Sequence, residues 1–173
     1  MPFKEGLVFV YDALRGFGLK KHIKLIASGK ITSGFDIFRA VSLGADLCYS
    51  ARAMMLSLGC IQALECNKNT CPTGVATQIP SLVSGLVVSD KKVKVASFHK
   101  ETIESFVELL AASGLDNPSK ISRRHINRRV FMNLTKSYAE IYPYVEEGCF
   151  FKPDKVPEAY KEHLAFAKAE AFA

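Results

Sequence analysis

Three of the chain's five cysteines, Cys60, Cys66 and Cys71, lie within twelve residues in the segment GCIQALECNKNTCPTGVATQ. Five residues separate the first pair and four the second, and these spacings match neither a zinc knuckle nor a CxxC redox pair. Three readings remain open: buried core thiols, a zinc site that recruits His99, and an iron-sulfur cluster. The spacing favours the cluster, because a three-iron cluster needs only three thiolates.

Two short turns rich in small residues form a second candidate site. Each follows a short apolar run that predicts a strand, and the two turns are Ser28-Gly29-Lys30 and Ser50-Ala51-Arg52. Small residues let backbone N–H groups approach an anion, and the final strand-to-helix turns of an α/β barrel are a common phosphate site. Ordinary turns of this composition also follow strands in many proteins, so both readings stay open.

The elements that carry these turns alternate between helix and strand. Apolar spacing predicts a helix over residues 6–19, and residues 32–34 can cap a second helix that Gly44 ends. Short apolar runs predict strands over residues 23–27 and 45–49, and an apolar segment covers 54–58. This order is typical of parallel βα units and predicts an α/β fold. Because two parallel strands do not make a sheet, the chain either completes a small sheet in another way or closes a larger α/β barrel.

The remainder of the chain has a different character. We expect a mixed loop over residues 79–94, a strong helix over 98–114, a short helix over 121–130 and a final helix over 159–171. Cys48 and Cys149 lie in apolar surroundings and are interpreted as packing residues, and no histidine is assigned a catalytic role.

The formal charge of +6 raises the question of whether the chain binds nucleic acid. The only dense basic run covers residues 122–129, and we interpret it as a solvated face. A basic nucleic-acid-binding module built on this run stays as an alternative. The odd number of cysteines and the lack of a leader predict a reducing, cytoplasmic setting, and no apolar run reaches the roughly 20 residues that span a bilayer.

The segment IKLIASGKITSGFDIFRAVSLGADLCYSARAMMLSLGCIQALECNKNTCPTGVATQ resembles the FMN-binding domain of glutamate synthases, above all the stand-alone FMN-binding glutamate synthase family. The resemblance is strong over residues 5–78 and less specific through Tyr144. The pattern Gly-Cys-x5-Cys-x4-Cys-Pro-x-Gly-Val-Ala-Thr-Gln is its most discriminating part.

The resemblance implies a 3Fe-4S cluster held by Cys60, Cys66 and Cys71. It also implies that the two turns contact the phosphate of FMN, through Ser28, Gly29 and Lys30 in the first and Ser50, Ala51 and Arg52 in the second. Many relatives have Asp-Gly-Gly where this chain has Ala27-Ser28-Gly29, so Gly29 is the better candidate for close backbone approach.

The implied architecture is the last two strands and helices of a TIM (β/α)8 barrel over residues 1–58, an iron-sulfur loop over 59–78 and a mainly helical extension over 79–173. The implied activity is reductive amination of 2-oxoglutarate to glutamate, with ammonia or glutamine as nitrogen source. The expected partners are the N-terminal half of the barrel and a reductase subunit or ferredoxin. We expect the chain to be the C-terminal portion of a longer or two-chain enzyme, inactive alone and without nucleic acid. An IMP dehydrogenase-type barrel with a single nucleophilic cysteine remains a second alternative.

Overall fold

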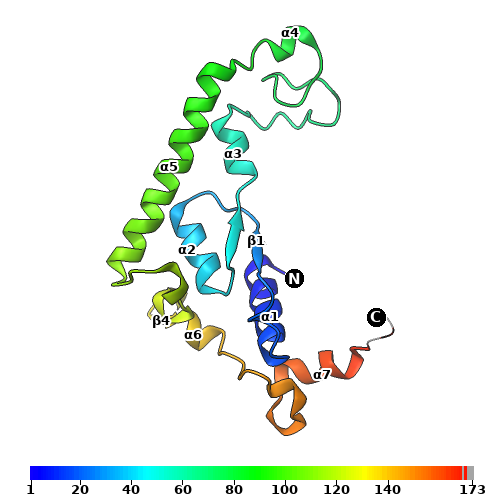
Figure 1. Cartoon of the computed structure of the whole chain (residues 1–173), viewed down its shortest axis with the longest axis vertical. Helices are drawn as coiled ribbons and strands as arrows, with labels where there is room; N and C mark the ends of the chain where they lie inside the picture. The colour runs from blue at the N-terminus through cyan, green and yellow to red at the C-terminus, as the bar shows by residue number, and fades with distance from the viewer. Residues whose placement is uncertain (169, 171–173) are drawn as a thin grey trace. The chain divides into compact units, whose positions relative to one another are not determined.

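The computed structural model describes residues 1–168 and 170, and these divide into two compact units. Unit 1 comprises Met1–Leu25, Ser42–Asp46 and the chain from Ser122 onward, and unit 2 comprises Ile26–Val41 and Leu47–Ile121. Each unit is described by itself (Figure 1). The mixture of helices and strands confirms the α/β prediction.

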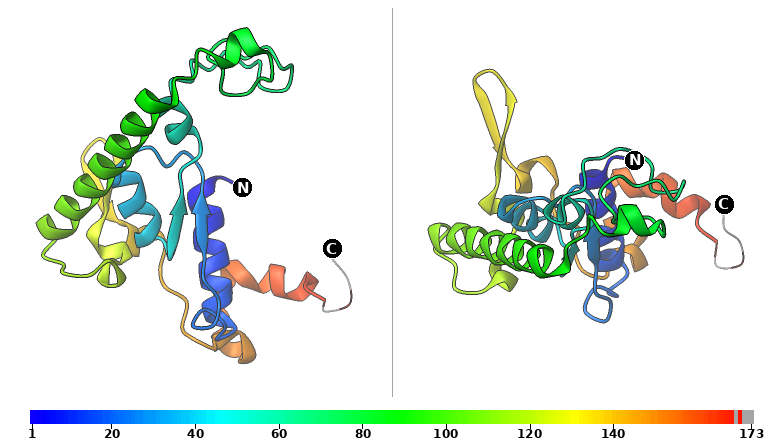
Figure 2. Two further views of the ribbon diagram at one scale, coloured as in Figure 1. Left: turned by 45° about the horizontal axis from the view of Figure 1, so that its top comes forward. Right: turned by 90° about the horizontal axis from the view of Figure 1, so that it is seen from above.

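Unit 2 contains a short parallel sheet. Strand β1 (Ile26–Ser28) pairs with β2 (Leu47–Tyr49) in the register Ile26↔Leu47 and Ser28↔Tyr49 (Figure 2). Helix α2 (Gly34–Ser42) connects the strands, and α3 (Arg52–Ser57) follows β2. The predicted order of strand, helix, strand and helix is confirmed, but β1 begins three residues later than predicted because only residues 26–28 find partners in β2.

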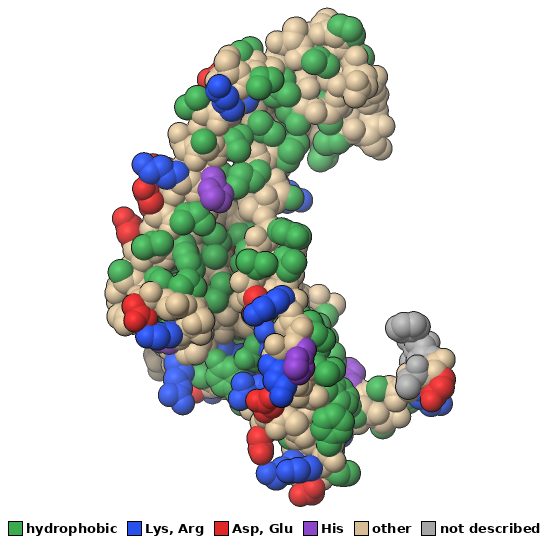
Figure 3. Space-filling view, viewed as in Figure 1, with side chains coloured by type: hydrophobic (Ala, Val, Ile, Leu, Met, Phe, Trp, Pro, Cys, Tyr) green, Lys and Arg blue, Asp and Glu red, His purple; other side chains and the backbone are tan. Residues whose placement is uncertain are grey.

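Two further helices complete unit 2, a short one, α4 (Pro80–Val83), and a long one, α5 (Val88–Ala112). Helix α5 contacts α3, and its buried Phe106 meets Phe38 of α2 with ring centroids 6.3 Å apart. Gly34 permits this packing, since a Cβ there would lie 2.5 Å from the backbone nitrogen of Phe106. Hydrophobic side chains also remain visible on the surface of the molecule (Figure 3).

The predicted loop over residues 79–94 is wrong, because α4 and the first two turns of α5 occupy it. The run VVSDKKVKV does not show an apolar stripe of helical period. The start of α5 is stabilised instead by an ion pair between side chains one helical turn apart. Asp90 lies in the first turn of the helix, and its carboxylate is 3.1 Å from the ammonium group of Lys94, one turn later.

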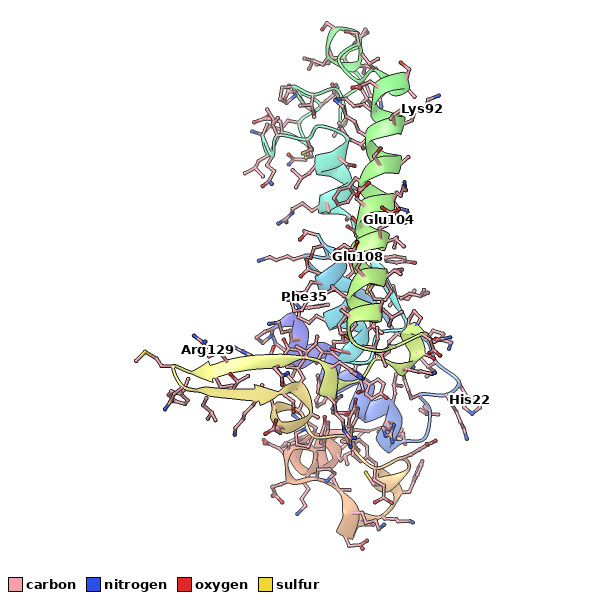
Figure 4. The ribbon with its side chains drawn as sticks, turned by 90° about the vertical axis from the view of Figure 1, so that its left-hand side faces the viewer. His22, Phe35, Lys92, Glu104, Glu108 and Arg129 are labelled. Atoms are coloured by element: carbon pink, nitrogen blue, oxygen red, sulfur yellow. The ribbon has the colours of Figure 1, made fainter. Side chains whose placement is uncertain are left out.

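Unit 1 begins with α1 (Phe3–Gly16), which confirms the first predicted helix with a shift toward the N-terminus. After the 3-10 turn η2 (Arg123–His125), strands β3 (Asn127–Phe131) and β4 (Leu134–Ser137) form an antiparallel hairpin that carries Arg129 (Figure 4). Three short helical turns follow, α6 (Tyr138–Ile141), η3 (Cys149–Phe151) and η4 (Pro153–Lys155), and then α7 (Glu158–Phe166).

The predicted helix over residues 121–130 is wrong. Residues 127–131 are extended because they pair with β4, a contact that the local sequence does not reveal. The basic run is also not a uniformly solvated face, since Arg123 is fully buried while Arg124, Arg128 and Arg129 are exposed. The final predicted helix is shorter than expected, and positions 169 and 171 of that prediction lie outside the described residues.

The two cysteines outside the segment of residues 59–78 were predicted to be packing residues. Cys149 is almost fully buried, as predicted, whereas Cys48 is half-buried. Among the described residues, no helix is long and apolar enough to cross a bilayer.

Candidate functional site

The two predicted phosphate turns lie at the same edge of the sheet in unit 2. Strands β1 and β2 are parallel, so both of their carboxyl ends point to this edge. The hydroxyl of Ser50 in the second turn donates a 2.7 Å hydrogen bond to the backbone carbonyl of Ile31, directly after the first turn. This bond ties the turns together. Lys30 has a left-handed backbone with a φ of 52°, which closes the first turn sharply.

A cavity of about 1000 Å³ opens beside these turns. It is lined by five of the six predicted turn residues, namely Ser28, Gly29, Lys30, Ala51 and Arg52. Ser50 is not part of the lining, because its hydroxyl is used to connect the turns. The volume is at the upper end of the range for small-molecule sites.

Other residues of the cavity were missed by the sequence reasoning. Thr32, Tyr49, Met55 and Leu56 also line it and give it an apolar wall with one phenol and one hydroxyl. Residues 55 and 56 follow Arg52 on α3, so the helical period could have indicated that they share its side of the helix.

The N-terminus of α2 next to the first turn is strongly capped. The backbone N–H and hydroxyl of Thr32 and the hydroxyl of Ser33 all donate to Oδ2 of Asp36, at 2.8–3.0 Å. Arg39 donates to Oδ1 at 2.6 Å. Burial of the Asp36 carboxyl raises its pKa, but these hydrogen bonds and the guanidinium outweigh burial and hold the pKa below its usual value.

Two of the three clustered cysteines reach the cavity. Cys60 and Cys66 contribute to its lining, together with Gln62 and Leu64 of the segment between them. Cys71 is not part of the lining. Within residues 1–168 and 170, no three His, Cys, Asp or Glu side chains are gathered as metal ligands would be, so two of the predicted ligands border the same cavity but the three do not form a ligand set.

The surroundings of Cys71 favour the thiolate form of its side chain. A hydrogen bond with the Thr73 hydroxyl, 3.4 Å away, and bonds from the backbone N–H groups of Ala76, Thr73 and Val75 lower the pKa of the Cys71 thiol to about 7. Thiolates bind metals, whereas thiols do not. Cys48 behaves in the opposite way, because burial raises the pKa of its thiol to about 11. The two cysteines are therefore chemically distinct.

Comparison with known proteins identifies relatives. A family model described as a conserved region in glutamate synthase matches residues 1–116. Glutamate synthase large subunit-like protein YerD of Bacillus subtilis is 40% identical over 126 residues, which cover 73% of this chain and 24% of that protein. The archaeal glutamate synthase [NADPH] of Methanocaldococcus jannaschii is 37% identical over 117 residues, covering 68% of this chain and 23% of that protein.

A more distant relative is the glutamate synthase [NADPH] large chain of Azospirillum brasilense, 30% identical over 125 residues that cover 72% of this chain and 8% of that protein. The chain thus spans about a quarter of the length of the first two relatives and less of the third. The family expected from the sequence is confirmed.

Proposed function

The chain belongs to the glutamate synthase family, a family of oxidoreductases, and from this premise we propose that it supplies part of the FMN site and the 3Fe-4S site of a glutamate synthase-type enzyme. The observation that carries the proposal is the cavity of unit 2. Its lining joins both small-residue turns with Cys60 and Cys66.

We assign the phosphate of FMN to the two turns. Lys30 and Arg52 line the cavity with positive charge, and Gly29 leaves room for an anion beside the backbone. Tyr49, Met55 and Leu56 would cover part of the flavin and exclude water from it. Bound FMN would supply hydride transfer, and this chain's residues would hold its phosphate and orient it.

The cluster is assigned to Cys60, Cys66 and Cys71. Their sulfur chemistry fits such a cluster, and the low pKa of the Cys71 thiol supports a thiolate ligand. Since the three thiols are not gathered among the described residues, cluster binding requires Cys60 and Cys66 to approach Cys71.

The reaction proposed for the whole enzyme is reductive amination of 2-oxoglutarate to glutamate. The strands that complete a (β/α)8 barrel and the electron donor, a reductase subunit or ferredoxin, would come from outside the residues described here. A barrel has eight strands, and the described parallel sheet has two. The chain alone is therefore expected to show no steady turnover.

The test is the iron, acid-labile sulfide and flavin content of the anaerobically purified chain after reconstitution. We expect about three irons per chain and a near-isotropic paramagnetic resonance signal in the oxidised sample. Cys60→Ser, Cys66→Ser and Cys71→Ser should each lose the signal, whereas the matched control Cys48→Ser should keep it. A folded chain that takes up no iron, or that retains iron in all three variants, would show the assignment to be wrong.

The phosphate turns are tested separately by titrating FMN and following the quenching of its fluorescence. Arg52→Gln should weaken binding by about tenfold, since a charge-assisted hydrogen bond contributes about 1.5–3 kcal/mol. Lys100→Gln, an exposed change on α5, should have no effect. Equal affinities for both variants would remove Arg52 from the site.

A further inference from the structure

The cysteine segment contains a loop, residues 69–78, that is closed by its own end residues. The backbone N–H of Gln78 donates to Oδ1 of Asn69 at 2.6 Å, and the Thr77 hydroxyl donates to the carbonyl oxygen of Asn69 at 2.6 Å. The same hydroxyl accepts a 3.1 Å bond from the N–H of Ile79. Two side chains thus join the start of the loop to its end.

The residue types at these positions fit this role. Asn69 has a φ of 62°, a left-handed conformation that asparagine adopts at lower cost than most residues. Thr77 is buried, and its hydroxyl both donates and accepts, which valine of the same shape could not do. Gly74 has a φ of 78°, and a Cβ there would lie 2.4 Å from the carbonyl oxygen of Leu82, so the loop also fits closely against α4.

Cys71 lies inside this closed loop. Its exposed fraction is 8%, its carbonyl accepts from the N–H of Gly74 at 3.2 Å, and its sulfur is 3.4 Å from the Thr73 hydroxyl. Cys71 is thus little exposed, and its hydrogen bonds are made with residues of the same closed segment.

The segment that carries Cys60 and Cys66 is different. Gln62 and Leu64 both have a φ of 58°, and Leu64 is 82% exposed. A leucine with a left-handed backbone and an exposed side chain is conformationally strained, and it gains no stabilisation from burial. This half of the segment is therefore the easier one to rearrange.

We propose that Asn69 and Thr77 are positioning residues that close residues 69–78 around Cys71 before any cluster is present, so that Cys71 is the fixed ligand and the Cys60–Cys66 segment moves to it. The role toward the cluster rests on the proposed function. The protection of the Cys71 thiol by the closure does not depend on the proposed function.

The first measurement is the alkylation rate of each cysteine by iodoacetamide in the metal-free full chain, read by mass spectrometry. It is made at pH 9.5, where ordinary thiols are mostly deprotonated, so that access to the sulfur decides the rate. Asn69→Gly removes the Oδ1 acceptor and keeps the left-handed backbone accessible, and Thr77→Val removes the hydroxyl and keeps the shape. Both should alkylate Cys71 about tenfold faster, with Cys60 and Cys66 unchanged.

Conservative variants and a matched control separate this role from general loosening. Asn69→Asp and Thr77→Ser keep the required oxygen atoms and should restore the slow rate at Cys71. Thr70→Val removes a hydroxyl of the same segment that bonds only the carboxylate of Glu65, at 2.8 Å, and should behave as the unaltered chain. Unchanged alkylation in Asn69→Gly and Thr77→Val, or equal acceleration at all three cysteines, would overturn the proposal.

The second measurement is iron uptake during reconstitution of the same variants. Slower or lower uptake in Asn69→Gly and Thr77→Val, restored in Asn69→Asp and Thr77→Ser, is the expected result. Normal uptake in the first two variants would overturn the role of the closure in ligand positioning. If the unaltered chain binds no iron, the proposed function fails, while the alkylation rates still decide whether the closure positions Cys71.

Discussion

The two units differ in their most distinctive feature, which is a buried ion pair in unit 1 and an uncovered parallel sheet in unit 2. In unit 1, the guanidinium of Arg123 donates to both oxygens of Asp12, at 2.8 and 3.2 Å, and to the carbonyls of Tyr142 and Pro143. The Tyr160 hydroxyl donates to Asp12 as well. Arg123 has an exposed fraction of 0%, so the charges at the centre of unit 1 are paired by groups of the chain itself.

In unit 2, by contrast, the sheet leaves apolar side chains in solvent. Leu47 of β2 is 57% exposed, and Ile26 of β1 and Tyr49 of β2 are exposed as well. Parallel sheets are ordinarily covered on both faces. Unit 1 exposes large apolar side chains too, among them Phe131, Met132 and Phe151, so what distinguishes the units is the buried ion pair of unit 1 and the uncovered parallel sheet of unit 2.

The largest effect is expected when a substitution breaks the ion pair of unit 1. Arg123→Ala leaves the carboxylate of Asp12 buried without its cation, and we expect a loss of about 3–5 kcal/mol in the free energy of unfolding at pH 7. Urea unfolding followed by circular dichroism measures it. The matched control is Arg124→Ala, an exposed change in the same turn, for which we expect a change within about 0.5 kcal/mol.

The pH dependence of this loss gives a second check. Burial raises the pKa of Asp12 above its usual value, although the bonds from Arg123 and Tyr160 act in the opposite direction. A carboxyl whose pKa is raised on folding favours the folded state below its unfolded value and loses that contribution as the pH rises. Without Arg123 the pKa of Asp12 rises further. The loss in the free energy of unfolding, relative to the unaltered chain, should therefore be smaller at pH 4 than at pH 7. A loss that stays constant with pH would exclude the unpaired carboxylate as its cause.

The burial of Arg123 shows where sequence reasoning about the fold ends. The order of helices and strands in residues 1–58 was predictable, because apolar period and capping residues are local signals. The partner of Arg123 is Asp12, 111 positions away, and nothing near residue 123 distinguishes it from its exposed neighbours Arg124 and Arg128. The pairing of β3 with β4 is local and was missed for a different reason, because the connection Met132-Asn133 lacks the Asn-Gly or Asp-Gly pair that marks a tight hairpin.

For the candidate site, too, one part of the arrangement was predictable from the sequence and another part was not. Parallel strands place their carboxyl ends at one edge, so the meeting of the Ser28 and Ser50 turns follows from the predicted βα order. The spacing of the cysteines indicated their chemistry but not their positions. Cys71 belongs to the segment that Asn69 closes through its left-handed backbone and the bond from the Gln78 N–H, and no periodicity in the sequence encodes these features.

A smaller effect is expected at the cap of α2, which tests whether unit 2 is well ordered locally in spite of its open sheet. Asp36→Asn replaces a carboxylate that accepts four hydrogen bonds, and we expect a loss of about 1 kcal/mol at pH 7. Because the pKa of Asp36 is lowered on folding, its contribution is present above the unfolded value and disappears as the pH falls through the folded value. The variant and the unaltered chain should therefore converge as the pH falls below the unfolded value of about 3.9. The exposed control Asp154→Asn should change the free energy of unfolding at pH 7 by less than about 0.5 kcal/mol. Equal stability at pH 7 would mean that the cap is not formed in solution.

The smallest effect is expected on the open face of the sheet. Leu47→Thr keeps a residue that favours strands and removes little buried surface, so the free energy of unfolding should change by less than about 0.5 kcal/mol. The same change at Leu43, which is fully buried in unit 1, should cost about 2–5 kcal/mol. Urea unfolding at two protein concentrations measures both. If Leu47→Thr proved as costly as Leu43→Thr, and more so at the higher concentration, the sheet of unit 2 would be covered in solution by a second copy of the chain, because burial by association depends on concentration while burial within one chain does not.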